Sequence, residues 1–184
     1  MSQLPDIIRE IPRVAADVVA QAATYQAAIL ADVAGRRGTL HGRISPVHEQ
    51  MKVAGPAFTV EVRPGDNLMI HAAIALAQPG DVLVIDGKAD LTAALMGTLM
   101  LSACKKRGLA GVVIDGAIRD KLELLDLGFP VFCAGYNPAG PTKYVPGRIN
   151  HAISAGGATI QPGDLVVGLS LIHISEPTRR RGIS

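Results

Sequence analysis

Aromatic side chains are scarce in this chain of 184 residues, which has three Phe, three Tyr and no Trp. Because proteins that bind single-stranded nucleic acid stack its bases on aromatic side chains, this scarcity argues against such a surface. The formal net charge is only +2, and Arg179, Arg180 and Arg181 against Glu176 account for all of it. The rest of the chain is neutral overall, so we expect no nucleic-acid partner.

Cysteines and long apolar runs are also few. Cys104 and Cys133 each stand alone in apolar surroundings, without the paired spacing of zinc or redox sites. We therefore expect two buried, reduced thiols in a cytoplasmic protein. No apolar run is long enough to span a bilayer, and charged residues interrupt the first stretch where a signal peptide needs an apolar core. We expect a soluble protein with no membrane partner.

Apolar residues make up 48% of the chain, which is enough for the core of one domain of ordinary size. Helical spacing of apolar residues predicts one amphipathic helix from Arg13 to Val33 and a buried helix from Leu68 to Ala77, capped by Asp66 or Asn67. Strict alternation from Val53 to Val62 predicts a strand that is buried on one face.

Strands and helices then alternate along the chain. We expect strands at 82–86, 111–115 and 129–134, helices at about 91–107 and 121–127, and a last strand pair at about 149–153 and 158–167. In such α/β units, ligands bind outside the carboxyl ends of the strands. Gly97 interrupts the helix at 91–107. Either it permits close packing, or a helix begins there and its exposed N–H groups form an anion site.

The most informative stretch is Gly111–Asp120, in which a buried strand leads through a Gly turn to an adjacent cation and carboxylate. Arg119 offers a fork of donors that suits a carboxylate, and Asp120 offers the oxygen ligand that Mg²⁺ or Mn²⁺ prefers. The alternative is structural, because Asp120 and Glu123 also form a capping box at a helix start. The local pattern alone favours the cap.

Three other polar residues carry weaker signals. His71 lies in the buried helix, where hydrogen-bonded packing is its commoner role. Lys143, in the Gly/Pro-rich connection from 135 to 147, is a candidate anion contact, as is Arg148 just beyond it.

Six segments, taken in order, resemble one family: Gly55–Val60, Pro79–Asp86, Gly97–Met100, Gly111–Asp120, Gly128–Phe132 and Pro162–Gly168. This is the family of 4-hydroxy-4-methyl-2-oxoglutarate aldolases, which includes the 4-carboxy-4-hydroxy-2-oxoadipate aldolases and the regulator of ribonuclease E activity. The resemblance implies an α/β protein with a β/β/α swivelling-domain-like layered fold. It also implies a homotrimer or hexamer with a divalent-metal site between subunits.

The resemblance also implies roles for individual residues. Asp120 is expected to be the direct ligand of a divalent metal cation, Mg²⁺ or Mn²⁺, and Arg119 the catalytic cation that binds substrate and stabilises an enolate. The backbone of Gly97, Thr98, Leu99 and Met100 is expected to bind the substrate carboxylate. With this support, the metal interpretation of Asp120 overtakes the helix cap.

The expected function is therefore that of a class II, metal-dependent pyruvate aldolase or oxaloacetate decarboxylase, a carbon–carbon lyase acting on small 2-oxo acids. Thr98 departs from the family aldolases, which carry Asp or Glu there. Because a hydroxyl holds water but is no base at neutral pH, Thr98 favours decarboxylation. The alternative function is a non-catalytic protein that inhibits a ribonuclease by protein contact.

The family pattern stops after Gly168. Residues 169–184 resemble translated sequencing adapter, so we expect a single domain at 1–168 followed by a non-native tail, and we exclude His173 from the site. In the family, the C-terminal part that this pattern lacks is expected to supply an acidic residue to the neighbouring subunit's site.

Overall fold

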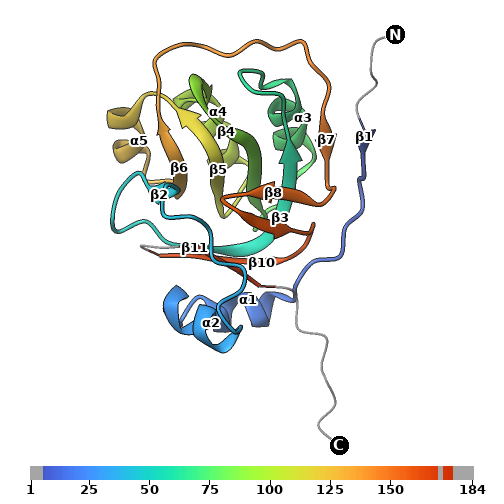
Figure 1. Ribbon diagram of the computed structural model, residues 1–184, viewed down its shortest axis with the longest axis vertical. Coiled ribbons are helices and arrows are strands. Elements are labelled where there is room, and N and C mark those ends of the chain that lie inside the picture. The colour runs from blue at the N-terminus through green and yellow to red at the C-terminus, as the bar shows by residue number, and fades with distance from the viewer. Residues whose placement is uncertain (1–5, 170–171, 176–184) are drawn as a thin grey trace, which may run out of the picture.

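The computed structural model in Figure 1 describes residues 6–169 and 172–175. Its centre is a parallel sheet in the order β3 (Val53–Glu61), β4 (Val82–Met96), β5 (Gly111–Ile118) and β6 (Val131–Tyr136). Short strands extend the sheet at both edges: β7 (Arg148–Ile149) and β1 (Asp6–Ile7) beyond β3, and β2 (Ser45–Pro46) beyond β6. The expected α/β class is confirmed.

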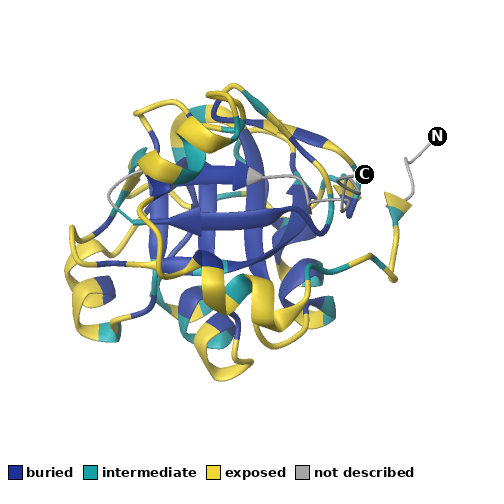
Figure 2. Ribbon diagram, turned by 90° about the horizontal axis from the view of Figure 1, so that it is seen from below, coloured by how far each residue is buried: buried dark blue, intermediate teal, exposed yellow. Residues whose placement is uncertain are grey.

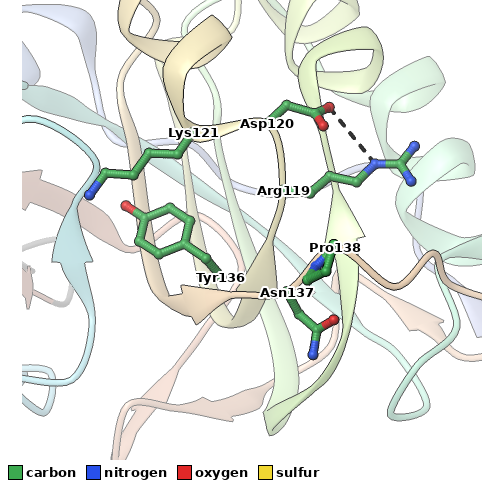
Figure 3. Close-up of a pocket in the computed structure, with 6 residues that line it drawn as sticks. All are labelled: Arg119, Asp120, Lys121, Tyr136, Asn137 and Pro138. Atoms are coloured by element: carbon green, nitrogen blue, oxygen red, sulfur yellow. Dashed lines mark ion pairs between the residues drawn. The ribbon is translucent and has the colours of Figure 1, made fainter.

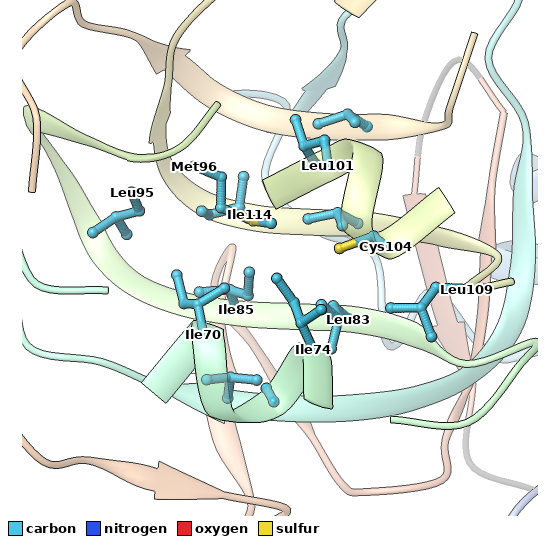
Figure 4. Packing of buried hydrophobic residues seen from close by; sticks show 14 of the residues in the cluster. Ile70, Ile74, Leu83, Ile85, Leu95, Met96, Leu101, Cys104, Leu109 and Ile114 are labelled. Carbon is cyan, nitrogen blue, oxygen red and sulfur yellow. The ribbon is translucent and has the colours of Figure 1, made fainter. Parts of the chain in front are cut away.

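Three helices cover one face of the sheet: α3 (Leu68–Leu76), α4 (Thr98–Lys106) and α5 (Lys121–Leu127). Figure 4 shows how Ile70 of α3 and Leu101 of α4 pack with Leu83 and Ile114 of the sheet in the larger of its apolar cores. Cys104 lies in this core as a free, buried thiol, as expected, and burial raises its pKa to about 12.

A second β-layer covers the other face. It contains the hairpin of β8 (Ile153–Ala155) and β9 (Ala158–Ile160) and the antiparallel pair of β10 (Leu165–Gly168) and β11 (Ile172–Ser175). The long strand β3 links the layers, because its first residues pair with β10 and the rest pair with β4. The helices α1 (Ala16–Ala22) and α2 (Ala27–Val33) pack outside β10 and β11.

Figure 2 shows this layering as buried strands surrounded by exposed helices and loops. The arrangement confirms the layered fold that the resemblance implied, and α1 and α2 add an outer layer to it. Within the described part of the chain, no helix has the length and apolar character needed to cross a bilayer.

Several expected boundaries were wrong. The single helix expected from Arg13 to Val33 is two helices, because the Thr24 hydroxyl donates to the Gln21 carbonyl at 2.7 Å and Gln26 is extended. The strand expected to end at Asp86 runs on to Met96, since its distal half pairs irregularly with β5. The helix that follows begins at Thr98, so the second interpretation of Gly97 is confirmed.

The remaining differences lie in the β-layers. Strand β3 is buried on both faces, and the Thr59 hydroxyl, expected to face solvent, donates to the His151 carbonyl at 2.7 Å. The strand pair expected at 149–153 and 158–167 is instead four short strands, β7 to β10.

The expected boundary at 168 stays a prediction. Residues 170–171 and 176–184 of the expected tail lie outside the described residues. Within the described part of that tail, β11 pairs with β10 in register, and His173 is buried opposite Val167.

Candidate functional site

Arg119 and Asp120 lie at the carboxyl end of β5, in the turn that leads into α5. Asp120 has a left-handed backbone (φ 62°, ψ 43°) and makes no side-chain capping bond to α5. The capping box with Glu123 was therefore wrong, because a helix cap ordinarily needs an extended backbone that aims its oxygen at the first turn. The Asp120 carboxylate turns instead toward the start of α4.

Two contacts define where the Asp120 carboxylate points. Its Oδ2 accepts the Thr98 N–H at 3.0 Å and lies 3.8 Å from Nε of Arg119. Both side chains remain partly open to solvent, with 44% of Arg119 and 38% of Asp120 exposed. An ion pair of this kind is weak in itself, so both groups keep capacity to bind a ligand.

Gly97 makes this arrangement possible by leaving space. Its backbone is extended (φ −146°), which any residue can adopt. A Cβ at this position would lie 2.5 Å from Asp120 Oδ2 and 2.9 Å from Cγ of Arg119. The glycine is therefore needed because Arg119 and Asp120 pack directly against its Cα.

The first turn of α4 brings backbone donors to the same place. The N–H groups in the first turn of a helix have no intrahelical acceptor, and they attract anions. Asp120 already occupies the N–H of Thr98. Those of Leu99 and Met100 follow it in the same turn, so the expected group at Gly97 to Met100 does meet Arg119 and Asp120 in space.

Two cavities open on either side of the Arg119–Asp120 pair. The first, which we call the α3-side pocket, has a volume of about 190 Å³ and includes Asn67, His71 and Lys143 in its wall. The second, the α5-side pocket, has a volume of about 300 Å³ and is formed by Lys121, Tyr136, Asn137 and Pro138 with the same pair. Figure 3 shows the α5-side pocket, in which Lys121 Nζ lies 4.8 Å from the centroid of the Tyr136 ring.

The α3-side pocket combines a cation with buried polar atoms. Asn67 is only 2% exposed, and its Nδ2 donates to the Leu95 carbonyl at 2.9 Å. Its Oδ1 and the hydroxyl of Thr98 are buried without a hydrogen-bond partner. Burial first, and then the charge of Lys143, lowers the pKa of His71, which favours a neutral imidazole at neutral pH.

The weaker candidates separate in space. Lys143 lies in the wall of the α3-side pocket. Arg148 does not, because its Nε donates to Glu61 at 2.6 Å away from either pocket. The cap of α3 is Asp66, which accepts the Leu68 N–H at 3.0 Å. Asn67 and Tyr136 were missed as site residues, and only their positions after a Pro-Gly-Asp turn and at a strand end could have indicated them.

The donor set can be tested for its fit to a divalent metal. Among residues 6–169 and 172–175, no group of three or more His, Cys, Asp or Glu side chains is arranged to hold an ion. Mg²⁺, however, keeps several waters and often takes only one or two protein carboxylates. Asp120 supplies one such carboxylate, and the unpartnered Thr98 hydroxyl could hold a water beside it. The residues present fit a hydrated ion, whereas they do not form a closed cage.

A layered α/β domain with an Arg–Asp pair beside a helix N-terminus defines the class of protein, and comparison with known families identifies which class this is. The family model RraA-like, described as Aldolase/RraA, matches residues 15–168. The chain belongs to this family.

Individual relatives support the assignment. The chain is 44% identical over 152 residues to a Halalkalibacterium halodurans protein named "Putative 4-hydroxy-4-methyl-2-oxoglutarate aldolase", covering 83% of this chain and 72% of the relative. The structure of Streptomyces coelicolor RraAS2, described as an unusual member of the RNase ES inhibitor RraA protein family, matches with a TM-score of 0.82 and 28% identity over 91% of this chain and 88% of that one.

A third comparison extends the fold assignment. The RNA-processing inhibitor RraA from Thermus thermophilis matches with a TM-score of 0.77 over 86% of this chain and 96% of that one. At 22% identity, this likeness shows a shared fold.

Proposed function

We propose that the protein is a divalent-metal-dependent lyase that forms pyruvate from small 2-oxo diacids. The observation that carries the proposal is the placement of Asp120, whose carboxylate is not used as a helix cap and lies beside Arg119 and the first turn of α4. A cation, a carboxylate and backbone N–H donors thus meet between two pockets. This is the set of groups that binding a 2-oxo acid through a metal requires.

Each residue has a distinct role in this proposal. The N–H groups of Leu99 and Met100 bind the carboxylate beside the keto group. Arg119 donates to the keto oxygen and stabilises the negative charge that develops there as the carbon–carbon bond breaks. Asp120 holds Mg²⁺ or Mn²⁺, which when bound supplies a positive charge that polarises the keto group.

Thr98 decides which cleavage is easier. Retro-aldol cleavage of a 4-hydroxy-4-methyl-2-oxoglutarate-type diacid requires a base to take the proton of the 4-hydroxyl group, and a threonine hydroxyl cannot do so at neutral pH. Decarboxylation of oxaloacetate breaks the bond to a carboxylate, leaves the electron pair as the enolate of pyruvate and releases CO₂. The enolate then takes a proton from water. We therefore expect oxaloacetate decarboxylation to be the faster reaction.

Assembly into a homotrimer or hexamer, with the site between subunits, is part of the proposal. Two leucines beside the site support it, since Leu99 of α4 is 86% exposed and Leu122 of α5 is 74% exposed. Exposed apolar side chains that flank a site indicate contact with another surface. Light scattering on the purified protein would measure the assembly.

A coupled assay for pyruvate tests the activity. With Mg²⁺ or Mn²⁺ present, the protein should release pyruvate from oxaloacetate above the rate of a protein-free control that contains the same metal. Arg119→Lys keeps the charge but loses the two-pronged donor, so the rate should fall about a hundredfold. No pyruvate above the control from either diacid would exclude the lyase.

A second function is favoured by the likeness to RraAS2, which is described as belonging to the RNase ES inhibitor RraA protein family. In this alternative the protein inhibits a ribonuclease by protein contact. It predicts that the purified protein lowers the activity of a purified RNase E-type enzyme, and that Asp120→Ala leaves this inhibition unchanged.

A further inference from the structure

The carboxylate of Asp66 is buried at the start of α3, with 1% of the residue exposed. One of its oxygens, Oδ1, accepts the Leu68 N–H at 3.0 Å. The other, Oδ2, accepts the Thr142 hydroxyl at 2.6 Å and the N–H groups of Tyr144 at 2.8 Å and Val145 at 3.2 Å. Asp66 therefore joins α3 to a segment more than seventy residues further along the chain.

These bonds keep Asp66 ionised. Burial acts to raise its pKa, but the hydrogen bonds from Thr142 and from the backbone outweigh burial and lower the pKa below its ordinary value. A buried carboxylate that accepts this many donors is costly to replace, because each donor that loses its acceptor stays desolvated.

Backbone bonds reinforce the same junction. The Thr142 N–H donates to the Gly65 carbonyl at 2.8 Å, and the Asn67 N–H donates to the Thr142 carbonyl at 2.9 Å. Lys143 lies between the residues that Asp66 binds, and it lines the α3-side pocket. Its charge acts on His71, one turn into α3, in the same pocket.

We propose that Asp66 is a positioning residue, which holds the segment 142–145 so that Lys143 binds the second carboxylate of a diacid in the α3-side pocket. The inference rests on the proposed function, in which the first carboxylate binds at the start of α4. A lysine side chain is long and flexible, and fixing its backbone reduces the entropy lost when it binds an anion. Asp66 thus sets the preference for a diacid over a monoacid without touching either.

Binding of two ligands by calorimetry, with Mg²⁺ present, tests this role without depending on turnover. 2-Oxoglutarate carries a second carboxylate and pyruvate does not. The unaltered protein should bind 2-oxoglutarate about tenfold more tightly than pyruvate, which is the expected worth of one charged hydrogen bond. Lys143→Met should remove this preference and leave pyruvate binding unchanged.

Asp66→Asn should have the same effect as Lys143→Met. Asn has a single acceptor oxygen, so either α3 or the segment 142–145 loses its acceptor. If both residues act through one contact, the double variant should be no worse than either single variant. Thr142→Val, which deletes only one of the bonds to Asp66, should reduce the preference part of the way and covers the case in which Asp66→Asn does not fold.

Asp81→Asn is the matched control. Asp81 is equally buried, at 1% exposed, and accepts bonds from Arg13 and from the Gln78 N–H at the opposite end of β4. It should lose stability and keep the preference for 2-oxoglutarate.

The inference is overturned if folded Asp66→Asn keeps the preference, if it weakens both ligands equally, or if the unaltered protein shows no preference. Failure of the lyase proposal would appear separately, as absent pyruvate release. The binding preference alone decides the role of Asp66.

Discussion

Two aspartates of the same stretch, Asp115 and Asp120, differ in how fully the protein satisfies them. Asp115 is buried at 3% exposed, and Arg43 donates to both of its oxygens at 2.9 and 2.8 Å. The Gly156 N–H adds a third bond at 2.7 Å. Asp120, five positions later, accepts only the Thr98 N–H among the described residues and lies 3.8 Å from Arg119.

This difference separates a structural carboxylate from one that can bind a ligand. Asp115 uses its acceptors to tie the loop around Arg43 and the β8–β9 turn to the sheet. Asp120 keeps acceptor capacity and faces two pockets. The same residue type thus serves stability where the protein supplies every donor, and binding where it does not.

Asp120→Asn should break the comparison most strongly. Asn tolerates the left-handed backbone and can still accept the Thr98 N–H, so the fold should be kept. Without the charge, metal binding should be lost, and pyruvate release should fall about a thousandfold. Calorimetry with Mn²⁺ and the coupled assay measure the two effects. Parental turnover in this variant would leave Asp120 without a role in the reaction.

Gly97→Ala tests the space on which Asp120 and Arg119 depend. The new methyl group would press on both side chains, and a displacement of about 1 Å should lower kcat/KM about a hundredfold. Gly42→Ala is the matched control, because a Cβ there meets nothing within 4 Å. If Gly97→Ala retained full activity, the packing of the pair against Gly97 would not matter for the reaction.

Arg43→Met tests the structural side of the comparison and has the smallest expected effect. It leaves Asp115 buried with fewer donors and should lower the free energy of unfolding at pH 7 by about 2 kcal/mol, less than for a fully buried pair because 35% of Arg43 is exposed. Activity should be unchanged. Urea unfolding followed by circular dichroism measures the loss, and Arg37→Met, at an exposed position, should show none.

The pH dependence of that loss sharpens the test. Burial acts to raise the pKa of Asp115, but the bonds from Arg43 and Gly156 outweigh it and lower the pKa below 3.8. The stabilisation from Arg43 is therefore fully present above pH 3.8 and is lost as the pH falls through the lower, folded-state pKa. The two proteins should converge in stability as the pH falls through this range. A difference that stayed constant down to pH 2 would mean that Arg43 stabilises the fold through packing.

Much of the fold could be predicted from local patterns. The helices α3 and α5 and the cores of strands β4 and β5 lie where apolar periodicity placed them, because their side chains face a continuous core. The boundaries of β4 and α4 could not be predicted. Leu91–Met96 has a helical composition, yet its backbone pairs with β5 and with the Ala139 carbonyl, which are distant in the chain.

For the site, the sequence alone determined that Arg119 and Asp120 follow a buried strand, since neighbours in the chain at a strand end stay neighbours in space. Only the tertiary structure decided what each carboxylate does. The left-handed turn at Asp120 directs its side chain to a helix 22 positions earlier. Asp66 likewise binds donors 76 to 79 positions later, which bring Lys143 to the pocket. A local pattern contains a residue's neighbours in the chain, whereas the partners that satisfy a buried carboxylate are chosen when distant segments pack together.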